Sequence, residues 1–151
     1  MALARIGVGA NLGDAARNVR AAIAALSHYG RVVRASSLYR AKAWGHTDQP
    51  DFINAAVIFD TELDPHGLLG ALKTIERQLG RKPNFHWGPR AIDLDILAYD
   101  DVRIDDRYLT IPHAQMHKRA FVLVPLAEID PSYNWALNAL PKEERDSVTR
   151  I

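Results

Sequence analysis

Residues 91–98 read AIDLDILA, a run in which apolar residues alternate with two aspartates. Side chains two positions apart on a β-strand point to the same face of a sheet. The run therefore predicts a strand over residues 91–98, with Asp93 and Asp95 on one face and apolar residues on the other. This strand is the last of a series of elements that defines the architecture.

Three further strands and two helices are predicted upstream of it. Asp14 and Asp64 are typical helix N-caps, and Pro65 suits the first turn of the second helix. Gly30 and Gly80 are expected to end the two helices. The strands are predicted at residues 4–9, 31–39 and 52–61.

The resulting order is strand, helix, strand, strand, helix, strand. This is the split arrangement of an α+β, ferredoxin-like βαββαβ sandwich, and the residues after 98 are expected to form a C-terminal extension. A length of 151 residues with 48% hydrophobic composition fits a single domain over residues 1–151.

The overall composition narrows the classes of partner. The 19 basic and 18 acidic residues nearly cancel, so the net charge gives no footprint for nucleic acid or an anionic membrane. The lack of cysteine excludes thiolate metal sites and thiol nucleophiles, so metal ligands must be oxygen or imidazole. No apolar run is long enough to span a membrane, and residues 3–10 are too short for a signal peptide. We expect a cytoplasmic monomer that binds small molecules.

The pair Asp93 and Asp95 carries the main chemical signal. Like-charged carboxylates on one strand face raise each other's pKa unless a cation lies with them, and their hard oxygens suit Mg²⁺. Arg81, Lys82 and Arg90 lie nearby in the sequence, and nucleotide phosphates need such a combination of carboxylates and cations. We predict that the aspartates hold Mg²⁺ on the phosphates of ATP. The alternative is a solvated strand face with ordinary exposed cations.

Two polar loops are predicted, at residues 41–51 and 81–89, and they contain Trp44 and Trp87. Loops of this length in a small domain are often functional. One interpretation is that they close over bound substrates and exclude water. The other interpretation is that each tryptophan anchors its loop by packing.

The aspartate pair belongs to a longer motif, HWGPRAIDLDIL at residues 86–97, and three other motifs accompany it in order. They are GANLGD (9–14), DQPDFINAAV (48–57), and IPH (111–113) with KRAFVL (118–123). Together they resemble the signature of the 6-hydroxymethyl-7,8-dihydropterin pyrophosphokinase family of folate biosynthesis, over residues 6 to about 131.

The resemblance implies that the hydroxymethyl oxygen of 6-hydroxymethyl-7,8-dihydropterin attacks the β-phosphorus of ATP and that AMP leaves, with ATP binding first. It implies two Mg²⁺ ions on Asp93 and Asp95, and aromatic faces and an amide for the flat pterin. The implied catalytic residues are Arg81, Arg90, Asp93 and Asp95; the ATP contacts are Glu76, Arg81, Lys82, Trp87, Arg90, Thr110, His113 and Arg119; the pterin contacts are Trp44, Phe52, Asn54 and Phe121.

Without the resemblance, these residues have plainer interpretations. Phe52 and Phe121 would be core residues, His113 a turn or core histidine, and Asn54 the end of a strand. The chain also departs from the family pattern. Ala10 replaces a serine, Tyr108 and Ala114 replace an arginine and a tyrosine of other members, and the second loop looks one residue shorter, without its second arginine. Lys82 could supply that charge but not the planar fork of arginine.

Three other functions are compatible with parts of the sequence. Gly7, Gly9 and Gly13 give a weak dinucleotide-binding signal, but the predicted sheet is not doubly wound and the sequence lacks the Gly-Lys-Ser/Thr of a P-loop. An RNA-binding sheet would need exposed strand aromatics beside basic residues, whereas Phe52 follows Asp51. A paralogue that binds a pterin without catalysis is the third; the presence of both aspartates argues against it.

Overall fold

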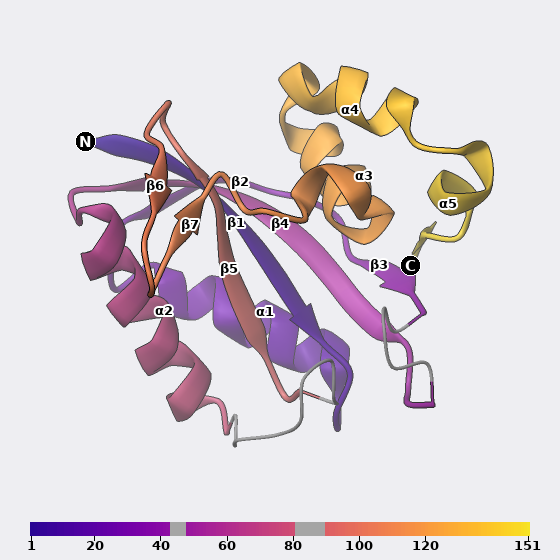
Figure 1. Ribbon diagram of the computed structural model, residues 1–151. Helices are drawn as coiled ribbons and strands as arrows, with labels where there is room; N and C mark the ends of the chain where they lie inside the picture. Colours follow the sequence, from indigo (N-terminus) through magenta and orange to yellow (C-terminus); the bar gives the residue numbers. More distant parts are fainter. Residues whose placement is uncertain (43–47, 81–89) are drawn as a thin grey trace.

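The fold is described by a computed structural model for residues 1–42, 48–80 and 90–151 (Figure 1). The strands are β1 (Ala2–Ala10), β2 (Arg31–Ala35), β3 (Tyr39–Ala41), β4 (Phe52–Thr61), β5 (Asp93–Tyr99), β6 (Ile104–Asp105), β7 (Thr110–Ile111) and β8 (Thr149–Arg150). The helices are α1 (Ala15–Leu26), α2 (Pro65–Gln78), α3 (Ala120–Ile129), α4 (Asn134–Ala139) and α5 (Lys142–Asp146), with 3-10 turns η1 (Met116–Lys118) and η2 (Pro131–Tyr133).

The main sheet is antiparallel, and helices cover both of its faces. This confirms the α+β class. Its strands lie in the order β5, β1, β4, β3, β8, and β2 pairs with the other half of β4. The strand–helix–strand–strand–helix–strand sequence of elements is also found. The doubly wound parallel sheet of a dinucleotide-binding fold is therefore ruled out.

Residues 31–39 do not form one continuous strand, and that prediction was wrong. The chain leaves the ladder at Ser36, between β2 and β3. The backbone N–H of Ser36 donates a hydrogen bond of 2.9 Å to the carbonyl of Ala56. The backbone N–H of Ala56 donates a hydrogen bond of the same length to the side-chain hydroxyl of Ser36. A side chain thus takes the place of a backbone carbonyl, and the ladder is interrupted because of it.

The helix caps follow the sequence closely. Asp14 accepts a hydrogen bond from the backbone N–H of Arg17, and Asp64 accepts one from that of Gly67. α2 is followed by Gly80 with φ of +90°, as predicted. α1 ends at Leu26, before the predicted stop at residue 30.

The two faces of the sheet are covered by different helices (Figure 1). Ala4, Ile6 and Val8 of β1 belong to the larger core, together with the apolar sides of α1 and α2. On the opposite face, α3 packs against apolar residues of β4 and β5. The residues of β1 that point to this second face include Gly7 and Gly9, which leave room beside α3.

In the C-terminal extension, α3 packs against the second face, α4 and α5 pack against α3, and the chain then returns to the sheet. β8 pairs with β3, so the last residues lie at the sheet edge opposite β5 (Figure 1). None of the helices in the described ranges combines the length and apolar character that a bilayer crossing requires.

Gly70 lies on the exposed side of α2, where an added Cβ would meet no atom within 4 Å. Glycine loses more backbone entropy than alanine in a helix, so Gly70→Ala is expected to raise the free energy of unfolding by about 0.5–1 kcal/mol. Urea denaturation monitored by circular dichroism measures this. An unchanged or lower midpoint would contradict the position of this residue on the helix.

Candidate functional site

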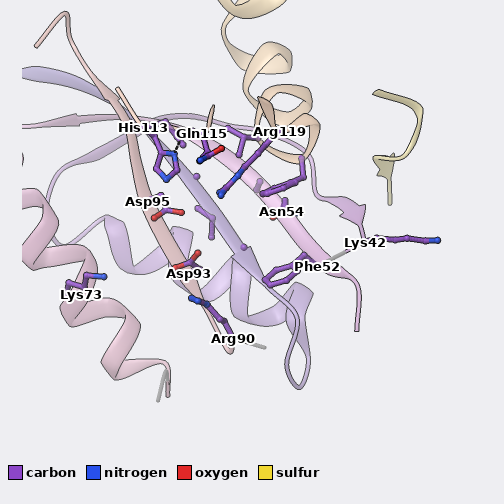
Figure 2. A pocket seen from close by; sticks show the side chains of 17 residues that line it. Lys42, Phe52, Asn54, Lys73, Arg90, Asp93, Asp95, His113, Gln115 and Arg119 are labelled. Carbon is purple, nitrogen blue, oxygen red and sulfur yellow. Dashed lines mark hydrogen bonds between the residues drawn. The ribbon is translucent and has the colours of Figure 1, made fainter. Parts of the chain in front are cut away.

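A cavity of about 500 Å³ lies on the α3 face of the sheet (Figure 2). Strands β1, β4 and β5 form its floor, and the start of α3 and the turn before it form its upper wall. Its lining includes Gly7, Gly9, Lys42, Phe52, Asn54, Lys73, Arg90, Asp93, Asp95, His113, Gln115, Arg119 and Phe121.

Strand register brings the polar residues together on the two sides of a pair of glycines in β1. Gly9 is paired with Asp93 on one side and Asn54 on the other. In the next row toward the middle of the sheet, Gly7 is paired with Asp95. The carboxylates of β5 and the amide of β4 therefore face one open space, because the strand between them carries glycine at both positions.

Gly9 is the position where the cavity floor is most sensitive to size. An added Cβ would lie 2.8 Å from Oδ1 of Asn54, so Gly9→Ala must displace that amide. We expect Gly9→Ala to weaken pterin binding about tenfold or more, measured by isothermal titration in the presence of a non-hydrolysable ATP analogue. Gly7→Ala is the matched control, since its Cβ would meet only the flexible Leu97 side chain, at 3.4 Å. Equal affinities of wild type and Gly9→Ala would contradict the prediction.

Asp93 and Asp95 are both partly exposed, toward the cavity. Burial, and then the charges of Asp93 and Glu76, raise the pKa of Asp95 to about 7. Arg119 and Lys73 oppose this rise. Burial and the neighbouring carboxylates thus disfavour the ionised form of Asp95, and a cation bound beside it would stabilise that form.

The donor set fits a magnesium ion that is shared with a substrate. Within residues 1–42, 48–80 and 90–151, no group of three or more histidine, cysteine or acidic side chains is placed to hold a metal. Mg²⁺ is commonly bound by one or two carboxylates together with substrate phosphates and water. Asp93 and Asp95 match that incomplete set, and they do not match a closed structural metal site.

The raised pKa of Asp95 makes stability depend on pH. The native state keeps this proton up to about pH 7, whereas the unfolded chain releases it near the ordinary value of 3.8. The native state binds more protons in this window, so the free energy of unfolding contributed by Asp95 falls as the pH rises from about 4 to about 7. Urea denaturation at about pH 5 and about pH 8, without Mg²⁺, measures it. Asp95→Asn should lose this dependence; a wild-type-like slope in the variant would contradict the assignment.

Arg90 is held in place by Asn11, the buried residue that follows β1. The side-chain Oδ1 of Asn11 accepts from the Arg90 backbone N–H at 2.8 Å, and its Nδ2 donates to Oε1 of Gln49 at 2.7 Å. Asn11 therefore fixes the backbone at Arg90, whose side chain lies at the Asp93 end of the cavity (Figure 2). Asn11 was not singled out from the sequence, although its place in the GANLGD motif was a usable signal.

His113 and Arg119 form the opposite wall (Figure 2). Nδ1 of His113 accepts a hydrogen bond from the backbone N–H of Gln115 at 3.2 Å, which leaves Nε2 as the protonated nitrogen of the neutral ring. Burial, followed by the charge of Arg119, lowers the pKa of His113, so the ring is neutral at pH 7. Burial also lowers the pKa of Arg119, while Asp95 and Asp93 raise it.

Two aromatic side chains and one amide side chain, those of Phe52, Phe121 and Asn54, lie on the side of the cavity opposite the carboxylates. Phe52 and Phe121 are only partly buried and line the cavity, so neither is an ordinary core residue. The guanidinium of Arg119 lies 5.6 Å from the ring centroid of Phe121. Asn54 is 5% exposed, and its Nδ2 has no hydrogen-bond partner within the part of the chain that the structure describes.

The structure brings together many, but not all, of the candidate residues. Glu76 is buried behind β5 and does not line the cavity, and Thr110 is exposed on β7 and does not line it either. Sequence reasoning also missed three cavity-lining residues with polar side chains, Lys42, Lys73 and Gln115. Four candidates lie outside the described residues: Trp44, Arg81, Lys82 and Trp87.

Comparisons with known proteins show the family of the chain. Residues 5–131 match the family model described as 7,8-dihydro-6-hydroxymethylpterin-pyrophosphokinase (HPPK). The chain is 50% identical to 2-amino-4-hydroxy-6-hydroxymethyldihydropteridine pyrophosphokinase of Methylorubrum extorquens, over 100% of this chain and 99% of that protein. It is 46% identical to the mitochondrial folate synthesis bifunctional protein of Arabidopsis thaliana, over 82% of this chain and 23% of that one.

Solved structures show the same fold in longer proteins. A crystal structure of a Plasmodium falciparum HPPK-DHPS variant with pterin and p-hydroxybenzoate matches with a TM-score of 0.78 at 15% identity. The match covers 99% of this chain and 47% of that one, so this chain spans less than half of the HPPK-DHPS chain. The family match and the identities, taken together, show that the chain belongs to the HPPK family and is a pyrophosphokinase.

Proposed function

We propose that the protein transfers the pyrophosphoryl group of ATP to the hydroxymethyl group of 6-hydroxymethyl-7,8-dihydropterin, in folate synthesis, and releases AMP. The single observation that carries this proposal is the row Asp93, Gly9, Asn54. In this row a carboxylate suited to magnesium phosphate and an amide suited to a heterocycle lie on the two sides of Gly9, and Asp95 adds a second carboxylate in the next row, opposite Gly7.

The pterin half of the proposal rests on Phe52, Asn54 and Phe121. A flat bicycle with a donor and acceptor edge needs aromatic contacts and an amide that can pair with that edge. Nδ2 of Asn54 supplies a buried donor within the cavity, with no partner among the described residues. The pterin would satisfy this group, with its hydroxymethyl group directed across Gly9 toward Asp93.

The phosphate half rests on the carboxylates and the cations around them. Asp93 and Asp95 would hold two Mg²⁺ ions, which when bound neutralise the triphosphate and bring its oxygens toward the carboxylates. Arg90 and Arg119 would bind phosphate oxygens, and the neutral ring of His113 would donate a hydrogen bond from Nε2. The resemblance adds Arg81, Lys82, Trp87, Thr110 and Glu76 as residues for ATP, and Trp44 for the pterin.

The residues that line the cavity align the two reactants, and the transfer requires no covalent intermediate with the protein. The hydroxymethyl oxygen forms a bond to the β-phosphorus, the bond from that phosphorus to the α,β-bridging oxygen breaks, and AMP leaves with the electron pair. The hydroxyl proton is lost to the phosphate oxygens or to water.

We further infer that the β1–α1–β2/β3–β4–α2–β5 unit is a ferredoxin-like sandwich and that residues 1–151 form one domain. The antiparallel order β5, β1, β4 with β2 and β3 outside it supports the first inference, because the split βαββαβ motif has this order. The packing of α3 on the same sheet, with α4 and α5 against α3, supports the second. The monomeric state and the cytoplasmic location stay predictions.

The test is to mix the protein with ATP, Mg²⁺ and 6-hydroxymethyl-7,8-dihydropterin and to follow the nucleotides by phosphorus NMR. Release of AMP only when pterin and Mg²⁺ are both present is the expected result. Release of ADP would refute the proposal, since it would mean cleavage of the β,γ bond. Pterin binding without turnover would also refute it and would favour a non-catalytic paralogue.

A further inference from the structure

Strand β5 is the terminal strand of the sheet in the described residues, and β1 is its neighbour. In an antiparallel ladder the backbone N–H groups point alternately to the two sides of a strand. The N–H of Leu94 points away from β1 and donates a hydrogen bond of 2.8 Å to Oε2 of Glu76, on α2. The contact lies midway between Asp93 and Asp95, whose side chains enter the cavity.

In the two preceding turns of α2, the position that corresponds to Glu76 is a leucine. Glu76 follows Leu68 and Leu72 at intervals of four residues, so the three form one row on the buried side of α2. The exposed fraction of Glu76 is 2%. Its second carboxylate oxygen, Oε1, lies 3.5 Å from Nζ of Lys73, a residue of the cavity lining.

A carboxylate at this position has an electrostatic cost. Its charge is one of the causes that raise the pKa of Asp95, and a leucine would continue the row without that repulsion. Burial of a charged group is tolerated where strong hydrogen bonds satisfy it, and a carboxylate that accepts from a backbone N–H makes one. The presence of Glu76 therefore indicates a function beyond packing.

We propose that Glu76 is a positioning residue that holds the edge strand β5 at the amide of Leu94 and so fixes the direction in which Asp93 and Asp95 enter the cavity. The inference rests on the proposed function, in which these two carboxylates hold Mg²⁺. It differs from the contact with ATP that the resemblance implies for Glu76, because this carboxylate is turned to the backbone of β5 and lies outside the cavity lining.

The decisive variants are Glu76→Gln and Glu76→Leu. The glutamine keeps an oxygen that can accept from Leu94, whereas the leucine fills the row but accepts nothing. Hydrogen exchange of the Leu94 amide is followed by ¹H–¹⁵N NMR on the protein without ligands. Exchange in Glu76→Leu is expected to be faster by about tenfold to a hundredfold, and in Glu76→Gln it should stay within about threefold of wild type.

Metal binding provides the second readout. Mn²⁺, used as a paramagnetic probe together with a non-hydrolysable ATP analogue, is titrated by electron paramagnetic resonance. We expect the affinity for Mn²⁺ to fall about tenfold or more in Glu76→Leu and to stay close to that of wild type in Glu76→Gln. The reason is that groups behind the metal ligands fix the orientation of those ligands. An equal loss in both variants would overturn the proposal, since the hydrogen bond would then not be the cause.

A general weakening of α2 must be separated from this specific contact. Asp64→Ala is the matched control, because it removes the N-cap hydrogen bond to Gly67 at the other end of the same helix. It should lower the free energy of unfolding but leave Leu94 exchange and Mn²⁺ affinity close to wild type. If Asp64→Ala reproduces the effects of Glu76→Leu, the positioning role is refuted.

The proposed function and the positioning role can fail separately. Leu94 exchange is measured without substrates and does not depend on which reaction the protein catalyses. Normal AMP release by wild type with no change of exchange in Glu76→Leu would overturn only the positioning role. A large change of exchange in a protein that releases no AMP would overturn only the reaction.

Discussion

Asp95→Ala is expected to lower kcat/KM for pyrophosphoryl transfer by about a thousandfold or more, and to stabilise the ligand-free fold at the same time. The loss of activity follows because half of the carboxylate pair is removed. The gain of stability follows because Asp95, whose pKa is raised to about 7, is ionised at about pH 8 against the charges of Asp93 and Glu76. Steady-state release of AMP and urea denaturation at about pH 8 measure the two effects.

Asp105→Ala provides the control for Asp95→Ala. Asp105 is an exposed aspartate on β6, outside the cavity lining, so its removal changes the net charge by the same amount. Neither activity nor stability should change by more than about twofold or about 0.5 kcal/mol. Unchanged Mg²⁺ affinity and turnover in Asp95→Ala would show that the catalytic carboxylates lie elsewhere.

Asn54→Leu is expected to weaken pterin binding by about a hundredfold while the free energy of unfolding stays within about 1 kcal/mol of wild type. Leucine has nearly the shape of asparagine but cannot pair with the polar edge of a pterin. The fold loses little, since the buried Nδ2 of Asn54 has no partner in the described residues and its desolvation is a cost to the native state. Isothermal titration of the pterin, with an ATP analogue bound, measures the affinity.

The opposite behaviour is expected of Thr61, another buried polar residue of β4. Its hydroxyl donates to the carbonyl of Tyr29 and accepts from the N–H of Leu63. Thr61→Val should therefore lower the free energy of unfolding by about 1–2 kcal/mol and leave pterin affinity unchanged. Retained pterin affinity in Asn54→Leu would place the pterin pocket elsewhere.

Much of the fold could be predicted from local patterns, because α1 and α2 each begin at an aspartate N-cap and the residues of β5 alternate between the two faces of the sheet. Asp64, Pro65 and Gly80 were sufficient to place α2. The break between β2 and β3 could not be predicted, since it depends on a hydrogen bond from Ala56 to the Ser36 hydroxyl. Local sequence contains no information on that partner, which lies 20 residues away.

The site could be predicted in part for a similar reason. The period of a strand was enough to place Asp93 and Asp95 on one face. The proximity of Asn54 depends on the register of three strands, so only the resemblance suggested it. Lys73 and the inward direction of Glu76 depend on how α2 packs beside the sheet edge, and no motif contains that information.

The alternation along β1 has a consequence for mutational tolerance. Ala4, Ile6 and Val8 meet only the apolar core, where one aliphatic side chain can replace another of similar volume. Gly9, beside them, has no side chain to exchange, and a Cβ there would meet the Asn54 amide that lines the cavity. Neighbouring positions of a single strand are thus expected to tolerate different substitutions, so that an aliphatic exchange in the core leaves the cavity unchanged.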